Sequence, residues 1–188
     1  MSDKESIRVL MKAKLRELDP IQRGKMNNHI FTTLSNWDLI KQSTSIGIYV
    51  SLNNEIDTHA LIKWGLQQNK IILVPKITST EHNTMVFCKI NDFEEDLKIG
   101  EFNILSPVDS IQPWKHKIDV IIIPGLTFDL FGNRIGKGKG YFDRYLFNSN
   151  AIKIGLAFNI QIQEQIPSEI TDVKMNYIVT ESQIIEVN

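Results

Sequence analysis

The sequence predicts a three-layer α/β fold in which helices cover both faces of a mainly parallel sheet. Short apolar runs rich in β-branched residues occupy residues 45–50, 70–75, 118–124 and 153–157, and each is typical of a buried strand. Segments with helical spacing of apolar residues separate several of these runs. Strands that are apolar throughout and alternate with helices favour a parallel sheet buried on both faces. The 188 residues contain no obvious linker, which favours a single domain spanning residues 1–188.

Two helices are predicted ahead of the first strand. Residues 4–18 repeat apolar side chains at helical intervals, with lysines and arginines between them. Asp19 is suited to cap a second helix, because Pro20 can then take the first helical position. This second helix should end before Trp37. After the first strand, Asp57 is expected to cap a third helix.

The remaining elements continue the alternation of strands and helices. Residues 85–90 predict a strand, and residues 91–114 are expected to be loops around one short element. A short helix should begin near Tyr141, residues 177–180 predict a late strand, and residues 184–185 are expected to add an edge strand. Ligands of such sheets bind beyond the carboxyl ends of the strands. The loops that follow the strands are therefore where function is expected.

The amino-acid composition restricts the classes of binding partner and the cellular compartment that are expected. The formal net charge of -1 provides no general attraction to nucleic acid or to anionic membranes. Cys88 is the only cysteine, so no intrachain disulfide and no cysteine metal cluster can form, and its apolar surroundings favour a small buried side chain. The charged N-terminus resembles no signal peptide, and no apolar run is long enough to span a bilayer. We therefore expect a cytoplasmic monomer that acts on small molecules, and not on nucleic acid or membranes.

A glycine-rich loop after residues 118–124 carries the clearest functional signal. Within nine residues, four glycines alternate with three cations: Gly132, Arg134, Gly136, Lys137, Gly138, Lys139 and Gly140. The glycines let the backbone turn tightly and present several N–H groups to one side. The helix expected near Tyr141 would add the positive end of its dipole. Together these features favour an anion site for phosphate groups, and Asp143, one turn into the helix, is suited to hold Mg²⁺ on them.

The spacing of this loop matches neither of two common nucleotide-binding loops. It is not a Walker A loop, because the glycine spacing differs and no Ser or Thr follows Gly138-Lys139. It is also too long for the dinucleotide-binding fingerprint. The alternative is a flexible, basic surface loop, since glycine and lysine are common in loops. The loop nevertheless joins the most apolar strand to a helix, which favours phosphate binding.

Residues 132–146, Gly-Asn-Arg-Ile-Gly-Lys-Gly-Lys-Gly-Tyr-Phe-Asp-Arg-Tyr-Leu, closely resemble the signature of the 5-formyltetrahydrofolate cyclo-ligase family, also called methenyltetrahydrofolate synthetases. Further segments resemble family motifs in the same order along most of the chain: Lys4-Glu-Ser-Ile-Arg8, Ser51-Leu-Asn-Asn-Glu-Ile-Asp-Thr58, Val74-Pro-Lys76, Pro124-Gly125, Phe128-Asp129 and Thr171-Asp-Val-Lys-Met-Asn176. Several ordered matches are far more specific than any one of them.

The resemblance implies a Rossmann-like α/β fold and a defined reaction. Members use ATP and Mg²⁺ to join the N5-formyl group of tetrahydrofolate to N10, giving 5,10-methenyltetrahydrofolate, ADP and phosphate. By resemblance, the residues expected to bind ATP are Lys4, Arg8, Arg134, Ile135, Gly136, Lys137, Gly138, Lys139, Gly140, Tyr141 and Phe142. Those expected to bind the folate are Val50, Glu55, Phe102, Lys139, Gly140 and Tyr141, and the expected magnesium ligands are Asp143 and Asp172.

The implied mechanism needs positioned charge and no protein nucleophile. The formyl oxygen attacks the γ-phosphorus of ATP, and N10 then attacks the activated carbon so that phosphate leaves. Arg134, Lys137 and Lys139 are expected to be catalytic, because they would stabilise charge on the transferred phosphoryl group. Two positions depart from the family pattern. Asn176 replaces a carboxylate found in many members, which removes one negative charge near the metal, and Phe102 stands where some relatives have tryptophan.

Several of these residues, and the chain as a whole, also have competing interpretations. Without the resemblance, Lys4 and Arg8 would be solvated charges on a surface helix, Asp172 could cap a turn, and Asp129 is expected to be a turn residue. A sugar-phosphate isomerase or CoA-transferase-like enzyme would also need a basic phosphate loop, but it would need a general base for which the sequence offers no candidate. A nucleotide- or RNA-binding module without catalysis is the other alternative, and the near-neutral charge argues against it.

Overall fold

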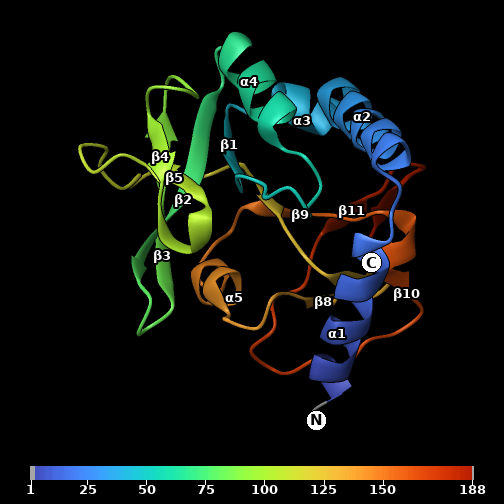
Figure 1. Ribbon diagram of the computed structural model, residues 1–188. Coiled ribbons are helices and arrows are strands. Elements are labelled where there is room, and N and C mark those ends of the chain that lie inside the picture. Colours follow the sequence, from blue (N-terminus) through green and yellow to red (C-terminus); the bar gives the residue numbers. More distant parts are fainter. Residues whose placement is uncertain (1–2, 188) are drawn as a thin grey trace.

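A seven-stranded sheet forms the centre of the computed structural model, which describes residues 3–187 (Figure 1). The ends of the predicted domain, residues 1, 2 and 188, lie outside the described residues. The strands of this sheet are β1 Ser45–Ile48, β2 Ile71–Ser79, β3 Thr84–Ile90, β6 Val120–Ile123, β9 Ile152–Leu156, β11 Tyr177–Val179 and β12 Ile184–Glu186. Their order is β12-β11-β9-β6-β1-β2-β3, with parallel pairing from β11 to β2 and an antiparallel strand at each edge. The predicted α/β fold with a mainly parallel sheet is confirmed.

Three helices cover one face of this sheet: α2 Pro20–Asn36, α3 Asp38–Gln42 and α4 His59–Gln67. The first helix, α1 Asp3–Arg16, adds Met11 and Leu15 to the same core. Every second residue of a strand points to this face, so Ile46 and Ile48 pack into the same core as Ile30 of α2 and Ile62 of α4. As predicted, Asp19 caps α2, since its carboxylate accepts a hydrogen bond of 2.9 Å from the N–H of Gln22. Figure 1 shows α2, α3 and α4 side by side, whereas α1 stands apart and approaches the strand ends.

The opposite face carries the short helix α5 Tyr141–Leu146 and a small second sheet. This sheet has the order β10-β7-β8, built from β7 Thr127–Asp129, β8 Arg134–Ile135 and β10 Ile162–Gln163. Phe128 of β7 is fully buried in the core that Leu146 of α5 also joins. The second helical layer is therefore thinner than the pattern of alternating elements predicts. Strands of two or three residues are too short to show a periodicity, which is why the sequence does not reveal them.

Residues 91–114 are more ordered than the single short element expected there. They contain an antiparallel pair, β4 Leu97–Ile99 and β5 Leu105–Pro107, joined by the 3₁₀ turn η1 Glu101–Asn103. Phe102 and Asn103 both have left-handed backbone angles, with φ values of 57° and 58°. A second 3₁₀ turn, η2 Asn159–Gln161, follows β9. Both turns border the cavity described below.

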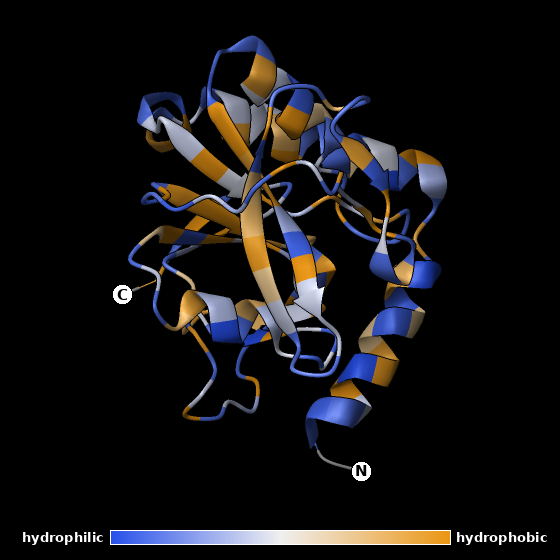
Figure 2. Ribbon diagram, turned by 90° about the vertical axis from the view of Figure 1, so that its left-hand side faces the viewer, coloured by the Kyte–Doolittle hydropathy of each residue, from blue (hydrophilic) through white to orange (hydrophobic). Residues whose placement is uncertain are grey.

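The distribution of hydrophobic residues agrees with a core between the sheet and the helices (Figure 2). The central strands are largely hydrophobic, while the N-terminal helix alternates between hydrophilic and hydrophobic turns. Its buried side chains are Met11 and Leu15. No helix within residues 3–187 is both long and apolar enough to cross a membrane.

Asp119 links the beginnings of two parallel strands. Its carboxylate accepts hydrogen bonds of 2.9 Å from the N–H groups of Thr44 and Ser45, and its own N–H donates to the Ser45 hydroxyl at 3.0 Å. The backbone hydrogen bond from Ser45 is the main cause that holds the pKa of Asp119 below its usual value.

Asp119 should therefore contribute to stability only while it is ionised. A folded-state pKa below the unfolded one adds stability above the unfolded pKa of about 3.9, and this stability is lost as the pH falls through the folded pKa. We expect Asp119→Asn to lower the free energy of unfolding at pH 7 and to approach the wild-type value below about pH 4. Urea unfolding across this pH range tests the expectation, and a constant difference between the two proteins at every pH would contradict it.

Candidate active site

A cavity of about 1520 Å³ lies at the carboxyl ends of the parallel strands. Residues that follow β1 and β6, among them Val50 and Pro124, line it together with Pro75 from within β2. The structure brings every predicted site residue to this cavity: Lys4, Arg8, Val50, Glu55, Phe102, Arg134, Ile135, Gly136, Lys137, Gly138, Lys139, Gly140, Tyr141, Phe142, Asp143 and Asp172. They come from α1, the loop after β1, the turn η1, the glycine-rich loop, α5 and a late segment.

The glycine-rich loop connects β8 to α5 and borders the cavity along residues 134–144. Gly138 and Gly140 have positive φ angles of 102° and 71°, which other residues adopt only with strain. No hydrogen bond to another described residue occupies the N–H groups of Lys137, Gly138 and Lys139. Since α5 has only six residues, these N–H groups and the neighbouring cations contribute more to an anion site than the helix dipole does.

Arg134 is more enclosed than its predicted role suggests. Its side chain is 5% exposed, and Nη2 donates to both carboxylate oxygens of Asp143 at 2.8 Å. Nη1 donates to the carbonyl oxygen of Pro124 at 3.2 Å, and Nε has no partner among the described residues. A Cβ atom at Gly136 would lie 2.6 Å from Nη1, so any larger residue there would force the guanidinium group to shift. Arg134 thus ties the start of the loop to α5 and to the end of β6.

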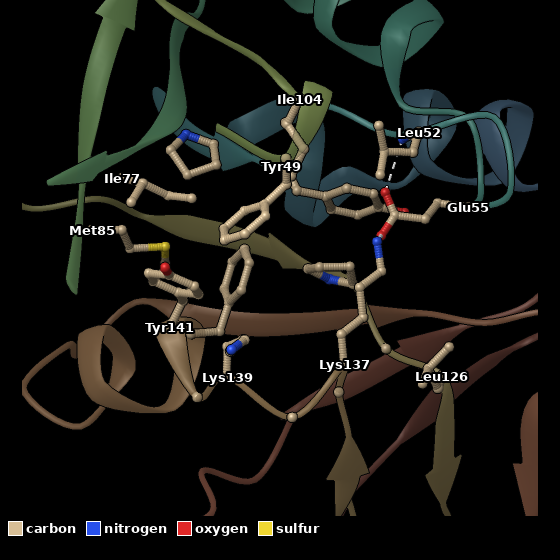
Figure 3. Close-up of a pocket in the computed structure, with 18 of the residues that line it drawn as sticks. Tyr49, Leu52, Glu55, Ile77, Met85, Ile104, Leu126, Lys137, Lys139 and Tyr141 are labelled. Carbon is tan, nitrogen blue, oxygen red and sulfur yellow. Dashed lines mark hydrogen bonds and ion pairs between the residues drawn. The ribbon is translucent and has the colours of Figure 1, made fainter. Parts of the chain in front are cut away.

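The two lysines of the loop have different surroundings (Figure 3). Lys137 Nζ lies 2.6 Å from the Glu55 carboxylate, which also accepts a hydrogen bond of 2.9 Å from the N–H of Leu52. Lys139 Nζ makes no hydrogen bond or ion pair with any described residue. Glu55 therefore neutralises Lys137 across the cavity, while the charge of Lys139 stays available to a ligand.

Helix α1 brings two cations to the same cavity. Lys4 Nζ lies 2.6 Å from Asp172 and 3.0 Å from Glu169, and Arg8 Nε donates to the carbonyl oxygen of Gly136 at 3.0 Å. Burial lowers the pKa of Lys4, but the hydrogen bonds to Asp172 and Glu169 outweigh it and leave this pKa above the usual value. Lys4 is therefore charged at neutral pH, and Arg8 fixes the position of the glycine-rich loop. Neither is a solvated surface charge.

An apolar wall faces the loop. Figure 3 shows Tyr49, Ile77, Met85, Ile104 and Tyr141 turned toward the cavity. Phe102, whose side chain is 53% exposed, approaches Tyr141 with 6.5 Å between the ring centroids. Burial, followed by the charges of Glu55 and Asp57, raises the pKa of Tyr49 well above its usual value. Tyr49 therefore stays a neutral phenol, which donates to the carbonyl oxygen of Ile56 at 3.0 Å. A flat, largely apolar ring system fits this wall.

The carboxylates assigned to magnesium are both paired with cations in this structure. Asp143 is bound by Arg134, and Asp172 by Lys4 and by the N–H of Glu169 at 2.7 Å. Asn176 does not line the cavity; its side-chain oxygen accepts a hydrogen bond of 2.9 Å from the N–H of Lys153 at β9. No group of three or more acidic, histidine or cysteine side chains within residues 3–187 is arranged to hold a metal. The donor set fits an ion bound mainly by phosphates, with one or two protein carboxylates.

Gln161 is a cavity residue that the sequence did not indicate. Its side-chain nitrogen donates to the carbonyl oxygens of Gly125 and Leu126 at 3.0 Å, and its side-chain oxygen accepts from the N–H of Phe158 at 2.8 Å. It therefore fixes the chain after β6 against the chain after β9. A single buried glutamine in a turn gives no pattern in the sequence that could have revealed this role.

The model of the 5-formyltetrahydrofolate cyclo-ligase family matches residues 1–181. The chain belongs to this family. A mouse 5-formyltetrahydrofolate cyclo-ligase is 30% identical over 96% of this chain and 94% of its own length, and that of Escherichia coli K12 is 26% identical over 94% of this chain and all of its own. These relatives confirm the predicted family and make the chain a ligase, which decides against the isomerase alternative.

Solved structures agree with this assignment. A 5,10-methenyltetrahydrofolate synthetase of Aquifex aeolicus superposes with a TM-score of 0.86 at 27% identity and covers 98% of this chain and 92% of its own. A 5,10-methenyltetrahydrofolate synthetase of Mycoplasma pneumoniae shares the fold with a TM-score of 0.74 at 20% identity, over 96% of this chain and 99% of its own. The α/β fold of the family is thus shared almost from end to end.

Proposed function

We propose that this cavity converts 5-formyltetrahydrofolate and ATP into 5,10-methenyltetrahydrofolate, ADP and phosphate. The observation that carries the proposal is that one cavity joins an apolar wall to loop N–H groups and a Lys139 ammonium that have no partner within residues 3–187. Such a cavity can hold a triphosphate against a flat reduced pterin. Family membership supports the same reaction.

The reaction must activate an amide, whose carbon is a poor electrophile. The formyl oxygen attacks the γ-phosphorus, and the bond to the β,γ-bridging oxygen breaks so that ADP leaves. N10 then attacks the formyl carbon, loses its proton, and expels phosphate as the methenyl bridge forms. The N–H groups of the loop and Lys139 are placed to bind the phosphoryl oxygens while negative charge spreads over them.

We infer different roles for the other cations from the ion pairs that they make around the cavity. Arg134 orients the loop through Asp143 and Pro124 rather than reaching freely into the cavity. Lys137 is held by Glu55, and we infer that it exchanges this carboxylate for phosphate oxygens when the nucleotide binds. Glu55 can then accept hydrogen bonds from the N–H groups of the pterin. Lys4 and Arg8 are placed to contact the nucleotide from α1.

Magnesium is proposed to bind with the nucleotide, held by Asp143 and Asp172 in addition to the phosphates. The ion would neutralise phosphate charge in the transition state. We also propose a cytoplasmic monomer. A cavity formed within one chain supports the monomer, and the near-neutral charge supports small molecules rather than nucleic acid or membranes as its partners.

An assay that follows two products tests the proposal. We expect ATP hydrolysis that depends on added 5-formyltetrahydrofolate, together with the absorbance of the methenyl product in equal amount. Removal of Mg²⁺ by a chelator should stop both signals, and added Mg²⁺ should restore them. Folded protein that forms no methenyl product, or that hydrolyses ATP equally well without the folate, would refute the proposed reaction.

A further inference from the structure

Two lysines from different elements meet at one carboxylate on the rim of the cavity. Lys76 of β2 places its Nζ 3.1 Å from Asp109 Oδ1 and 3.3 Å from the carbonyl oxygen of Val108. Lys98 of β4 is hydrogen-bonded to Asp109 Oδ2. All three charged residues line the same cavity as the glycine-rich loop. The two lysines, called the lysine pair below, exceed the charge of Asp109 by one positive unit.

The exposure of these groups argues against a purely stabilising role. The side chain of Asp109 is 79% exposed and that of Lys98 is 50% exposed. Ion pairs as exposed as these contribute little to folding stability. The hydrogen bonds from Lys98 and then Lys76 hold the pKa of Asp109 below its usual value, so it is an anion at neutral pH. Asp109 thus shows that the lysine pair can share one carboxylate, and its exposure lets another carboxylate replace it.

The lysine pair comes from elements that also contribute to the apolar side of the cavity. Lys76 and Ile77 both belong to β2 and line the cavity, and Figure 3 places Ile77 on one side of Tyr49 and the Lys137–Glu55 ion pair on the other. Lys98 lies on the same β4–β5 hairpin as Phe102, whose exposed ring faces Tyr141. A ligand that fits both features has an aromatic ring followed by carboxylate groups.

We propose that Lys76 and Lys98 bind the carboxylates of the glutamyl tail of the folate, with Asp109 holding the lysine pair in place until the tail arrives. The inference rests on the proposed function, because a folate carries an aminobenzoyl ring joined to glutamate. The ring would lie against Phe102 and Ile104, and the tail carboxylates would reach the lysine pair at the rim. The N–H groups of the loop that have no partner among the described residues are better suited to phosphates than two ammonium groups that already share a carboxylate, so the nucleotide is a poorer occupant of the lysine pair.

The test compares two substrates, 5-formyltetrahydrofolate and the matching 5-formyltetrahydropteroate, which lacks the glutamate. For wild-type protein the glutamate should lower KM. The measured quantity is the KM for the pteroate divided by the KM for the folate. We expect Lys98→Met to reduce this ratio about three- to tenfold, because one partly exposed charge-assisted hydrogen bond is lost. Asp109→Asn should increase this ratio, because it removes the carboxylate that competes with the glutamyl tail for the lysine pair. Added salt should reduce the wild-type advantage as well.

Lys63→Met is a matched control, because Lys63 is 49% exposed and paired with Glu94 at 2.7 Å but lies outside the cavity. Its KM ratio for the two substrates should equal the wild-type ratio. If Lys98→Met and Asp109→Asn also keep the wild-type ratio while wild-type protein turns over both substrates, the tail site is refuted and the proposed reaction stands. If wild-type protein forms methenyl product from neither substrate, both proposals fail.

Discussion

Lys139→Ala is expected to lower kcat by at least about tenfold, on the scale seen when one donor to a transition state is removed. Lys139 lines the cavity without an ion-pair partner among the described residues, so its charge is available to the phosphoryl group. The substitution breaks no ion pair among the described residues, so the stability of the folded protein should change little. Steady-state kinetics with saturating ATP and folate, together with a thermal melt, separate the loss of turnover from any loss of stability.

Lys174→Ala serves as the control for this variant, because Lys174 is exposed and does not line the cavity. Arg134→Ala should lower kcat by a similar factor, but it should also lower the melting temperature, since it removes the Nη2 group that binds both oxygens of the Asp143 carboxylate. Turnover at the wild-type rate in both Lys139→Ala and Arg134→Ala would mean that the loop does not act on the transferred phosphoryl group.

Asp129→Ala should cost about 3–5 kcal/mol of unfolding free energy, equivalent to a fall of roughly 6–20 °C in melting temperature. The Asp129 side chain is fully buried and accepts four hydrogen bonds: from the N–H groups of Phe131, Asn133 and Ile166, and from the Asn133 side chain. Alanine would leave these buried donors without an acceptor. Urea denaturation followed by circular dichroism gives the change directly.

Glu164→Ala is the companion variant, since Glu164 is an exposed acid close to Ile166 and has no side-chain partner among residues 3–187. It should stay within about 0.5 kcal/mol of the wild type. A loss below about 1 kcal/mol for Asp129→Ala would show that water replaces the carboxylate as acceptor. The hydrogen bonds of Asp129 also agree with the role in a turn, and not in catalysis, that the sequence predicts for it.

The long, strongly patterned elements could be predicted from sequence. The run of isoleucines at 121–123 predicts a buried strand, and Asp19-Pro20 marks the start of α2 correctly. These signals are local, since each depends on a few consecutive residues. The small sheet β10-β7-β8 could not be predicted in the same way, because its strands are two or three residues long and β10 pairs with β7 across more than thirty positions of sequence.

Which residues line the cavity was easier to predict than which ion pairs these residues form. The glycine-rich loop was recognisable from its glycines and cations, and every residue assigned by resemblance lines one cavity. The sequence did not reveal that Arg134 is bound by Asp143, or that Lys137 faces Glu55. These pairs join residues whose side-chain directions depend on the completed fold. They leave Lys139 as the cation of the loop that no described acid neutralises.

The ion pair between Lys4 and Asp172 joins positions that are 168 residues apart, at the two ends of the chain. A growing polypeptide cannot make this contact until residue 172 has been synthesised, long after α1 has emerged. Until then, the part of the cavity wall that Lys4 and Asp172 form cannot assemble. A fragment that stops before residue 172 should therefore bind ligands of the cavity less tightly than the 188-residue chain does.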